Sequence, residues 1–281
     1  MNQLALTQDH RTAERPDTDP VVQLRSASLS FGDRVLWQNL DLDIRKGEFF
    51  AVLGPNGSGK TSLLKVLLGL QPLDAGTATV NGSAVRRGSR DIGYIPQQKS
   101  FPPETPLRAR DLVGLGVDGH RWGLRWRGRD YNDTVDALLE KVGASSYADA
   151  PVGRLSGGEQ QRLRAAQALA TNPQVLLCDE PLLSLDLHHQ QAVSGLINSQ
   201  CRDNDSAVVF VTHEINPIID YVDRVLYLAE GQFRVGPPHE VMTSEVLSEL
   251  YKSNVEVLHS KGRIIVVGLP DDTTHHHAEG H

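Results

Sequence analysis

The segment that most constrains the fold is a glycine-rich octapeptide, Gly54-Pro55-Asn56-Gly57-Ser58-Gly59-Lys60-Thr61. It follows a short apolar run, Phe49 to Leu53, and precedes a helical pattern that extends from Lys60 to about Leu70. A strand, a glycine-rich loop and a helix in this order predict a phosphate-binding P-loop, because glycines let backbone N–H groups turn inward around an anion. The helix N-terminus adds partial positive charge at the same place.

A second motif supplies carboxylates. The apolar run Val175 to Cys178 predicts a strand, and Asp179 and Glu180 follow it directly. In a P-loop enzyme, Asp179 fits a Mg²⁺-positioning role, and Glu180 fits a base that activates the attacking water. Lys60 is expected to reach the β- and γ-phosphates, with the Thr61 hydroxyl as a Mg²⁺ ligand. Because ligands of α/β sheets gather at the carboxyl ends of the strands, the two motifs are expected to lie together.

A third segment, Leu155 to Arg162, reads Leu-Ser-Gly-Gly-Glu-Gln-Gln-Arg. Its Ser156 and Glu159 match a capping box, which predicts that a helix begins here and runs through Ala170. The capping box does not explain the two glycines or the glutamine pair. Two glycines at a helix N-terminus make a second anion-binding site. One nucleotide held by both sites implies two chains that face one another.

Together these motifs resemble the nucleotide-binding subunits of ABC transporters, over essentially all of residues 21–267, and Leu155–Arg162 is similar to the ABC signature. The resemblance implies an α/β fold of the P-loop NTPase type. This fold has a RecA-like parallel core, an antiparallel β edge subdomain and a helical lobe at about residues 98–165. The implied activity is ATP hydrolysis, with ATP and Mg²⁺ bound.

The resemblance also implies individual roles in binding ATP. Phe31, 23 residues before Gly54, matches the aromatic residue that stacks on adenine. The residues expected to hold the nucleotide are Phe31, Gly54, Pro55, Asn56, Gly57, Ser58, Gly59, Lys60, Thr61 and Thr212. The residues expected to reach the nucleotide of the opposite chain are Ser156, Gly157, Gly158 and Asp186, the last of these in a D-loop.

For catalysis, Gln97 matches the Q-loop and His213 matches the switch histidine of the same family. The expected catalytic residues are Glu180, His213, Gln97 and Lys60, and the expected Mg²⁺ ligands are Thr61, Gln97 and Asp179. One departure is Leu182, which stands where the family usually has threonine. This position is not expected to touch the chemistry.

Composition and patterning set the domain organisation. The chain has 28 basic and 35 acidic residues, and this net charge of −7 argues against a nucleic-acid partner. No apolar run reaches the ~18 residues that predict a membrane-spanning helix. Residues 1–20 are polar and lack the pattern of a signal peptide, so a disordered arm is expected there. The ABC ATPase domain is expected over residues 21–268, followed by a polar, histidine-containing tail over 269–281.

Apolar periodicity predicts the remaining elements. Alternation from Val22 to Ile44 predicts an antiparallel edge sheet, and residues 104–170 show a mostly helical pattern. Strands alternating with helices favour a parallel core. Further strands are predicted at Asp91–Tyr94, Val208–Val211, Val225–Leu228 and Ile264–Val267, and a helix at Pro238–Tyr251.

The partners and the transported solute are implied only by resemblance. Thr212–Leu228 and Glu180–Leu187 are similar to the ATPases of zinc and manganese importers, and imidazoles in the tail suit zinc. A solvated tail explains those histidines equally well. The implied partners are a membrane permease, a second copy in a head-to-tail homodimer and an extracellular metal-binding protein, with the chain peripheral at the cytoplasmic side of the cell membrane. The tail histidines are His275, His276, His277 and His281.

Two other classes of P-loop enzyme do not fit the sequence, whereas two interpretations within the ABC family stay open. A GTPase needs an Asn-Lys-x-Asp segment, which is absent, and a small kinase has no use for Leu155–Arg162. The alternatives within the resemblance are an ABC ATPase for another solute and a non-transport member such as an iron–sulfur assembly factor. The basic segment His120–Arg129 fits contact with lipid headgroups or with the permease. The surface that couples ATP hydrolysis to transport is expected in Gln98–Asp111, directly after Gln97.

Overall fold

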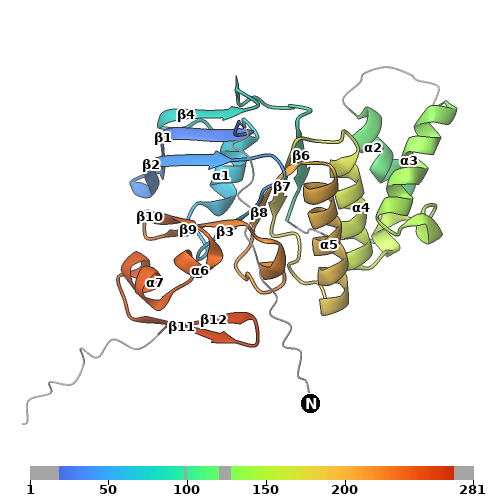
Figure 1. The fold of residues 1–281 in the computed structure, drawn as a ribbon. Coiled ribbons are helices and arrows are strands. Elements are labelled where there is room, and N and C mark those ends of the chain that lie inside the picture. Colours follow the sequence, from blue (N-terminus) through green and yellow to red (C-terminus); the bar gives the residue numbers. More distant parts are fainter. Residues whose placement is uncertain (1–18, 98–99, 120–127, 269–281) are drawn as a thin grey trace, which may run out of the picture.

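The computed structural model describes residues 19–97, 100–119 and 128–268 (Figure 1). The predicted arm lies outside the described residues except for its last two positions, and the histidine tail lies outside them entirely. Most of the basic segment, residues 120–127, is also outside. Within the described part, no helix is both long enough and apolar enough to cross a bilayer.

A six-stranded sheet forms the centre of the molecule, with the strand order β10-β9-β3-β8-β7-β6. All neighbouring strands are parallel except β10, which pairs antiparallel with β9. This arrangement confirms the predicted parallel core. The strands are β3 (Phe49–Leu53), β6 (Ile92–Ile95), β7 (Val175–Asp179), β8 (Ala207–Val211), β9 (Arg224–Ala229) and β10 (Gln232–Gly236).

The predicted antiparallel edge is a four-stranded sheet with the order β2-β1-β4-β5. Helix α1 (Lys60–Leu67) lies between this sheet and the central sheet and ends three residues before the predicted position (Figure 1). Its Leu63 and Leu64 pack in one core with Leu24 and Trp37 of the edge sheet. The strands are β1 (Val22–Phe31), β2 (Arg34–Ile44), β4 (Ala75–Val80) and β5 (Ser83–Ala84).

Strand β3 is buried on both faces, and its alternating side chains enter two different cores. Phe50 and Val52 face the core that contains α1, whereas Phe49, Ala51 and Leu53 pack with helices on the opposite face. Continuous apolar sequence is the expected signature of such a strand. The P-loop therefore starts from a strand that is fixed on both sides.

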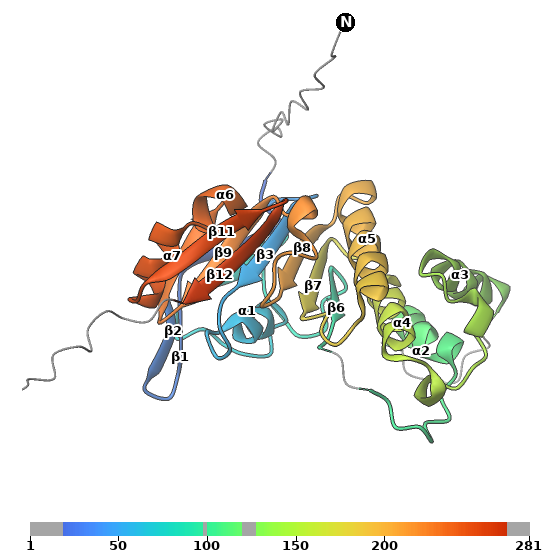
Figure 2. The same ribbon diagram turned by 90° about the horizontal axis from the view of Figure 1, so that it is seen from below.

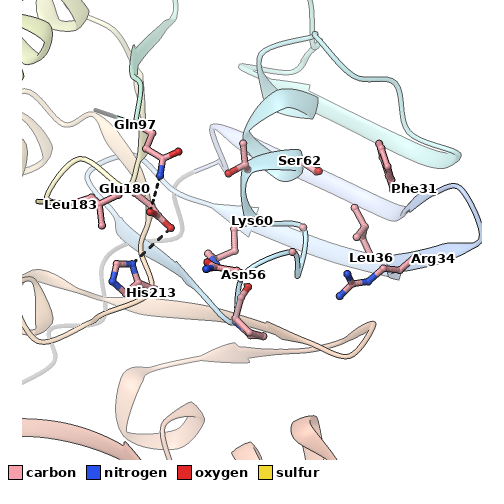
Figure 3. A pocket seen from close by; sticks show the side chains of 14 residues that line it. Phe31, Arg34, Leu36, Asn56, Lys60, Ser62, Gln97, Glu180, Leu183 and His213 are labelled. Atoms are coloured by element: carbon pink, nitrogen blue, oxygen red, sulfur yellow. Dashed lines mark hydrogen bonds and ion pairs between the residues drawn. The ribbon is translucent and has the colours of Figure 1, made fainter. Parts of the chain in front are cut away.

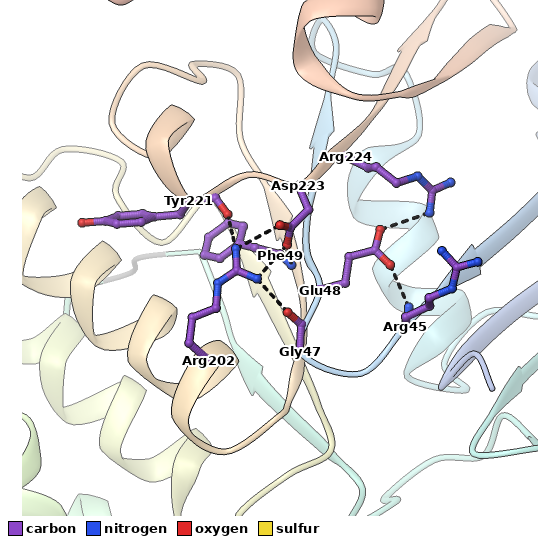
Figure 4. Close-up of polar contacts among 8 residues, drawn as sticks. All are labelled: Arg45, Gly47, Glu48, Phe49, Arg202, Tyr221, Asp223 and Arg224. Carbon is purple, nitrogen blue, oxygen red and sulfur yellow. Dashed lines mark hydrogen bonds and ion pairs between the residues drawn. The ribbon is translucent and has the colours of Figure 1, made fainter. Parts of the chain in front are cut away.

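The opposite end of β3 is held by a polar network (Figure 4). Arg202 donates to both carboxylate oxygens of Asp223 at 3.0 and 3.1 Å and to the carbonyls of Gly47 and Tyr221. Asp223 in turn accepts the backbone N–H of Phe49 at 2.7 Å. Bidentate arginine–carboxylate pairs fix orientation as well as distance. This network aligns the starts of β3 and β9, whose other ends flank the P-loop.

The helical lobe contains α2 (Ala109–Asp118) and α3 (Arg129–Lys141), which lie farthest from the central sheet (Figure 2). Helix α4 (Gly157–Leu169) packs on the lobe and also on the central core. The predicted capping box is present, since Ser156 and Glu159 each accept the backbone N–H of the other. Helix α5 (Leu187–Asp203), for which no element was predicted, begins at the N-cap Asp186.

The C-terminal part differs from its prediction. The single helix predicted over Pro238–Tyr251 is divided into α6 (Pro238–Val241) and α7 (Ser244–Tyr251), because Thr243 caps a new helix by accepting the N–H of Val246. The predicted last strand pairs with an unpredicted one as a hairpin, β11 (Val255–Ser260) and β12 (Arg263–Gly268).

Candidate functional site

The P-loop has the backbone that an anion-binding loop requires. Gly54, Gly57 and Gly59 all have positive φ angles, of 138°, 79° and 101°, where a side chain is disfavoured. The Lys60 ammonium folds onto the loop and donates to the carbonyls of Gly54 at 2.7 Å and Pro55 at 3.0 Å. Burial lowers the pKa of Lys60. A buried cation beside the unpaired N–H groups of a helix start fits a phosphate.

The donor set next to Lys60 fits Mg²⁺. The Thr61 hydroxyl donates to the Asp179 carboxylate at 3.1 Å, so the predicted oxygen ligands of the P-loop and of β7 already meet. Burial raises the pKa of Asp179, and it also raises the pKa of Tyr94 to about 12, with the charge of Asp179 as a second cause. Hard oxygen donors are those Mg²⁺ prefers, and a divalent cation would offset the cost of burying the carboxylate charge.

Glu180 lies between two of the other predicted catalytic residues, Gln97 and His213 (Figure 3). Its carboxylate accepts a hydrogen bond from the Gln97 amide at 3.1 Å, and the other oxygen is 3.8 Å from Nδ1 of His213. Glu180 has a φ of 45°, while its N–H donates to Val211 of the neighbouring strand. Strained backbone of this kind clusters at functional sites. The prediction that Asp179 and Glu180 lie beside the P-loop is thus reproduced by the fold.

These groups line one cleft of about 890 Å³. Phe31 lies at the end of β1 on one side, and Glu180, Gln97 and His213 lie on the other, with Lys60 between them (Figure 3). The Phe31 side chain is 78% exposed, so it is not a core residue of the edge sheet. The lining residues are Phe31, Arg34, Leu36, Pro55, Asn56, Gly57, Gly59, Lys60, Thr61, Ser62, Gln97, Glu180, Leu183 and His213.

Some predicted nucleotide residues are outside this lining. Gly54 and Ser58 are buried, and Asp179 is buried behind Thr61. The hydroxyl of Thr212 makes hydrogen bonds with the backbone of Glu214, so it shapes the turn after His213. Four lining residues were not predicted from the sequence, namely Arg34, Leu36, Ser62 and Leu183. For Arg34 and Leu36, the only signal in the sequence was their proximity to Phe31.

The residues expected to act on an opposite chain gather at a second place. Ser156, Gly157 and Gly158 start α4, and Asp186 starts α5. The two helix starts touch, because a β-carbon at Gly158 would lie 2.8 Å from Nε2 of His189, and His189 is hydrogen-bonded to Asp186. None of the four lines the cleft.

One of the two glutamines that the capping box left unexplained, Gln160, joins α4 to the loop after Gln97. Gln160 is buried, and its side-chain oxygen accepts the N–H of Phe101 at 3.1 Å. Its amide nitrogen donates to the carbonyls of Val152 and Leu155. Arg164, one turn later, lies 4.9 Å over the Phe101 ring. The loop that carries Gln97 is therefore attached to the helix that carries the signature.

Comparisons with known proteins agree with this geometry. Residues 37–183 match the family model described as ABC transporter. The manganese transport system ATP-binding protein MntB of Halalkalibacterium halodurans is 30% identical over 89% of this chain and 100% of its own length. The zinc import ATP-binding protein ZnuC of Marinobacter nauticus is 32% identical over 85% and 86%. The hemin import ATP-binding protein HmuV of Thermobifida fusca is 34% identical over 85% and 84%.

Solved structures give the same result. An inward-facing ABC transporter assigned to the metal-chelate type superposes with a TM-score of 0.76 at 26% identity, covering 90% of this chain and 99% of the other. A dimeric ATP-binding cassette in a post-hydrolysis state, bound to ADP and Pi, superposes with a TM-score of 0.66 at 28% identity, covering 77% and 98%. The chain therefore belongs to the ABC transporter family, as an ATP-hydrolysing transporter subunit.

Proposed function

We propose that two copies of this chain bind two ATP molecules head to tail and hydrolyse them to drive a membrane permease. The observation that carries the proposal is the position of Glu180 in the same cleft as Lys60, held by Gln97 and facing His213. In this arrangement Glu180 accepts a proton from the attacking water. Lys60 and the P-loop N–H groups bind the phosphates, and His213 donates to the γ-phosphate.

The remaining roles follow from the same cleft. Phe31 offers an exposed aromatic face on which adenine stacks. Thr61, Asp179 and Gln97 would hold Mg²⁺, which would supply positive charge to neutralise the phosphates. Since Gln97 donates to Glu180 here, its side-chain oxygen remains available to the metal. The helix starts at Ser156, Gly157, Gly158 and Asp186 complete the site of the partner copy, which is supported by their position outside the chain's own cleft.

The nucleotide part is tested by removing one ammonium group. Lys60→Ala is expected to abolish ATP binding, measured with a fluorescent ATP analogue, because the buried ammonium and the loop it closes are lost together. Lys65→Ala is the matched control, since Lys65 is exposed on the same helix and is outside the cleft. Equal ATP binding by the two variants would contradict the assignment.

We further propose that the solute is a divalent transition metal, zinc or manganese, imported through a permease and delivered by an extracellular metal-binding protein. The manganese and zinc relatives support this choice. The chain would then sit at the cytoplasmic side of the cell membrane as a peripheral subunit. The loop after Gln97 is suited to contact the permease, because Gln160 and Arg164 join it to the signature helix.

The hemin relative, at 34% identity, supports a second candidate, import of a metal chelate. Uptake assays separate the two. In cells that lack the gene, we expect uptake of labelled zinc or manganese to fall and to be restored by the wild-type chain, but not by Lys60→Ala. Normal uptake of both ions with loss of hemin uptake would favour the chelate and overturn the free-metal proposal.

A further inference from the structure

Asp186, His188 and His189 form a cluster of metal-ligating groups outside the ATP cleft. One carboxylate oxygen and two imidazole nitrogens lie within 4.8 Å of one another at the start of α5. Asp186 and His188 are exposed and His189 is half-buried, so an ion in solution can reach all three. The mechanism described above uses only Asp186 of this group.

Two of the three ligands are already held in place. The backbone N–H of His189 donates to Oδ1 of Asp186 at 2.9 Å, and Nδ1 of the ring lies 2.8 Å from Oδ2. With the ring proton on Nδ1, His189 donates a hydrogen bond to the Asp186 carboxylate, and a cation that binds both atoms takes the place of this proton. Zinc–nitrogen and zinc–oxygen bonds of about 2.0–2.1 Å place two ligands of a tetrahedral ion roughly 3.3 Å apart. The observed pair needs only a small opening.

The third ligand is within reach of the same point. The rings of His188 and His189 meet edge to face, with their centroids 5.6 Å apart. The His188 side chain is exposed, and one of its ring nitrogens lies within 4.8 Å of both other ligand atoms. Two imidazoles and one carboxylate are a donor set that zinc favours, and water completes its tetrahedral shell. The N-terminus of α5 opposes a cation, and the charge of the Asp186 carboxylate offsets this.

We propose that Asp186, His188 and His189 bind a zinc ion and that this ion inhibits ATP hydrolysis. The inhibitory part rests on the proposed function, in which Asp186 reaches the nucleotide of the partner copy. A carboxylate bound to zinc is withdrawn from that contact. The ring of His189 also lies against Gly158, so the ion fixes both helix starts at once. A ligand that binds the open chain better than the closed dimer must oppose closure.

The binding site is tested directly with nucleotide-free protein. Alanine replaces the four tail histidines in every sample, so that zinc bound by the tail is not counted. We expect titration calorimetry with ZnCl₂ to show one ion per chain, and His188→Ala to weaken binding at least about tenfold. His239→Ala is the matched control, since it removes another exposed histidine beside a carboxylate, Glu240. Equal zinc affinity of His188→Ala and His239→Ala would overturn the site.

The inhibitory part has its own measurement. Without zinc, His188→Ala is expected to hydrolyse ATP at the wild-type rate. With zinc near its dissociation constant, the wild type and His239→Ala should lose at least half of this rate, and His188→Ala should keep it. Equal inhibition of all three chains would overturn the inhibitory role. A chain without any ATPase activity would contradict the proposed function instead, and the calorimetric result would be unaffected by that failure.

Discussion

The backbone of Gly54 passes so close to the carbonyl oxygen of Leu228 that a β-carbon at position 54 would overlap this oxygen. Gly54 is the first residue of the P-loop, and Leu228 belongs to β9, the parallel neighbour of β3. The φ of Gly54, 138°, is also outside the range that other residues adopt readily. The start of the phosphate-binding loop is thus set by contact between two strands.

Gly54→Ala is therefore expected to be strongly destabilising, by more than about 3 kcal/mol, because neither backbone can move without disturbing the sheet. Gly82→Ala is the control. Gly82 also has a positive φ, of 69°, but no atom lies within 4 Å of its added β-carbon, so it should cost only about 1–2 kcal/mol. Urea unfolding of the nucleotide-free chain measures both. Similar losses would show that contact with Leu228 does not matter.

The contact between Gly158 and His189 gives a second prediction. Gly158→Ala places a β-carbon in the imidazole ring, so we expect it to lower both stability and ATPase activity. The second substitution His189→Ala removes the obstacle. The double variant should be more stable than the sum of the two single effects predicts, by about 1 kcal/mol or more. Additive effects in thermal unfolding would mean that the two helix starts are not coupled.

Asp179 predicts a pH dependence. Its pKa is raised by burial, so the folded chain binds a proton there more readily than the unfolded chain. The stability from this group is then fully present below the unfolded pKa and is lost as the pH rises through the folded pKa. Asp179→Asn removes this titration.

Between about pH 4 and pH 7, Asp179→Asn should therefore gain stability relative to the wild type when no Mg²⁺ or nucleotide is present. The melting temperatures of both proteins across this range measure the effect. Adding MgATP should stabilise the wild type more than Asp179→Asn, because only the wild type keeps the carboxylate. A constant difference between the two proteins across this range would contradict the burial argument.

Much of the fold was predictable because its core strands are continuous apolar runs. β3, β7 and β8 were all placed correctly, since both of their faces are buried. α5 was not predicted, because its sequence is largely polar and its capping residue, Asp186, was interpreted only as a D-loop residue. β11 was missed for a related reason, since most of its side chains are not buried.

Predicting the site from the sequence had a clear limit. The motifs identified Lys60 at the end of the glycine-rich loop that follows β3, and Asp179 and Glu180 at the end of β7. Some of their neighbours, such as Tyr94 and Arg34, were beyond sequence reasoning. The hydroxyl of Tyr94 lies 3.5 Å from Asp179 only because β6 and β7 are paired, and Arg34 reaches the P-loop only through the packing of the edge sheet. Contacts between distant segments depend on tertiary packing, which local patterns do not specify.

The central claim is that Glu180 is the base for water attack, and one substitution tests it most directly. Glu180→Gln keeps the size of the side chain and its ability to accept from Gln97, but it removes the group that takes the proton. Glu214→Gln is the matched control, because Glu214 is exposed nearby and is outside the ATP cleft. The measurement is the steady-state rate of ATP hydrolysis, with ATP binding and dimer formation followed on the same samples. We expect Glu180→Gln to bind ATP, accumulate as a dimer and lose at least about 99% of turnover, a loss of the size that general base catalysis supplies, while Glu214→Gln keeps the wild-type rate. A Glu180→Gln chain that hydrolyses ATP at the wild-type rate would contradict the account.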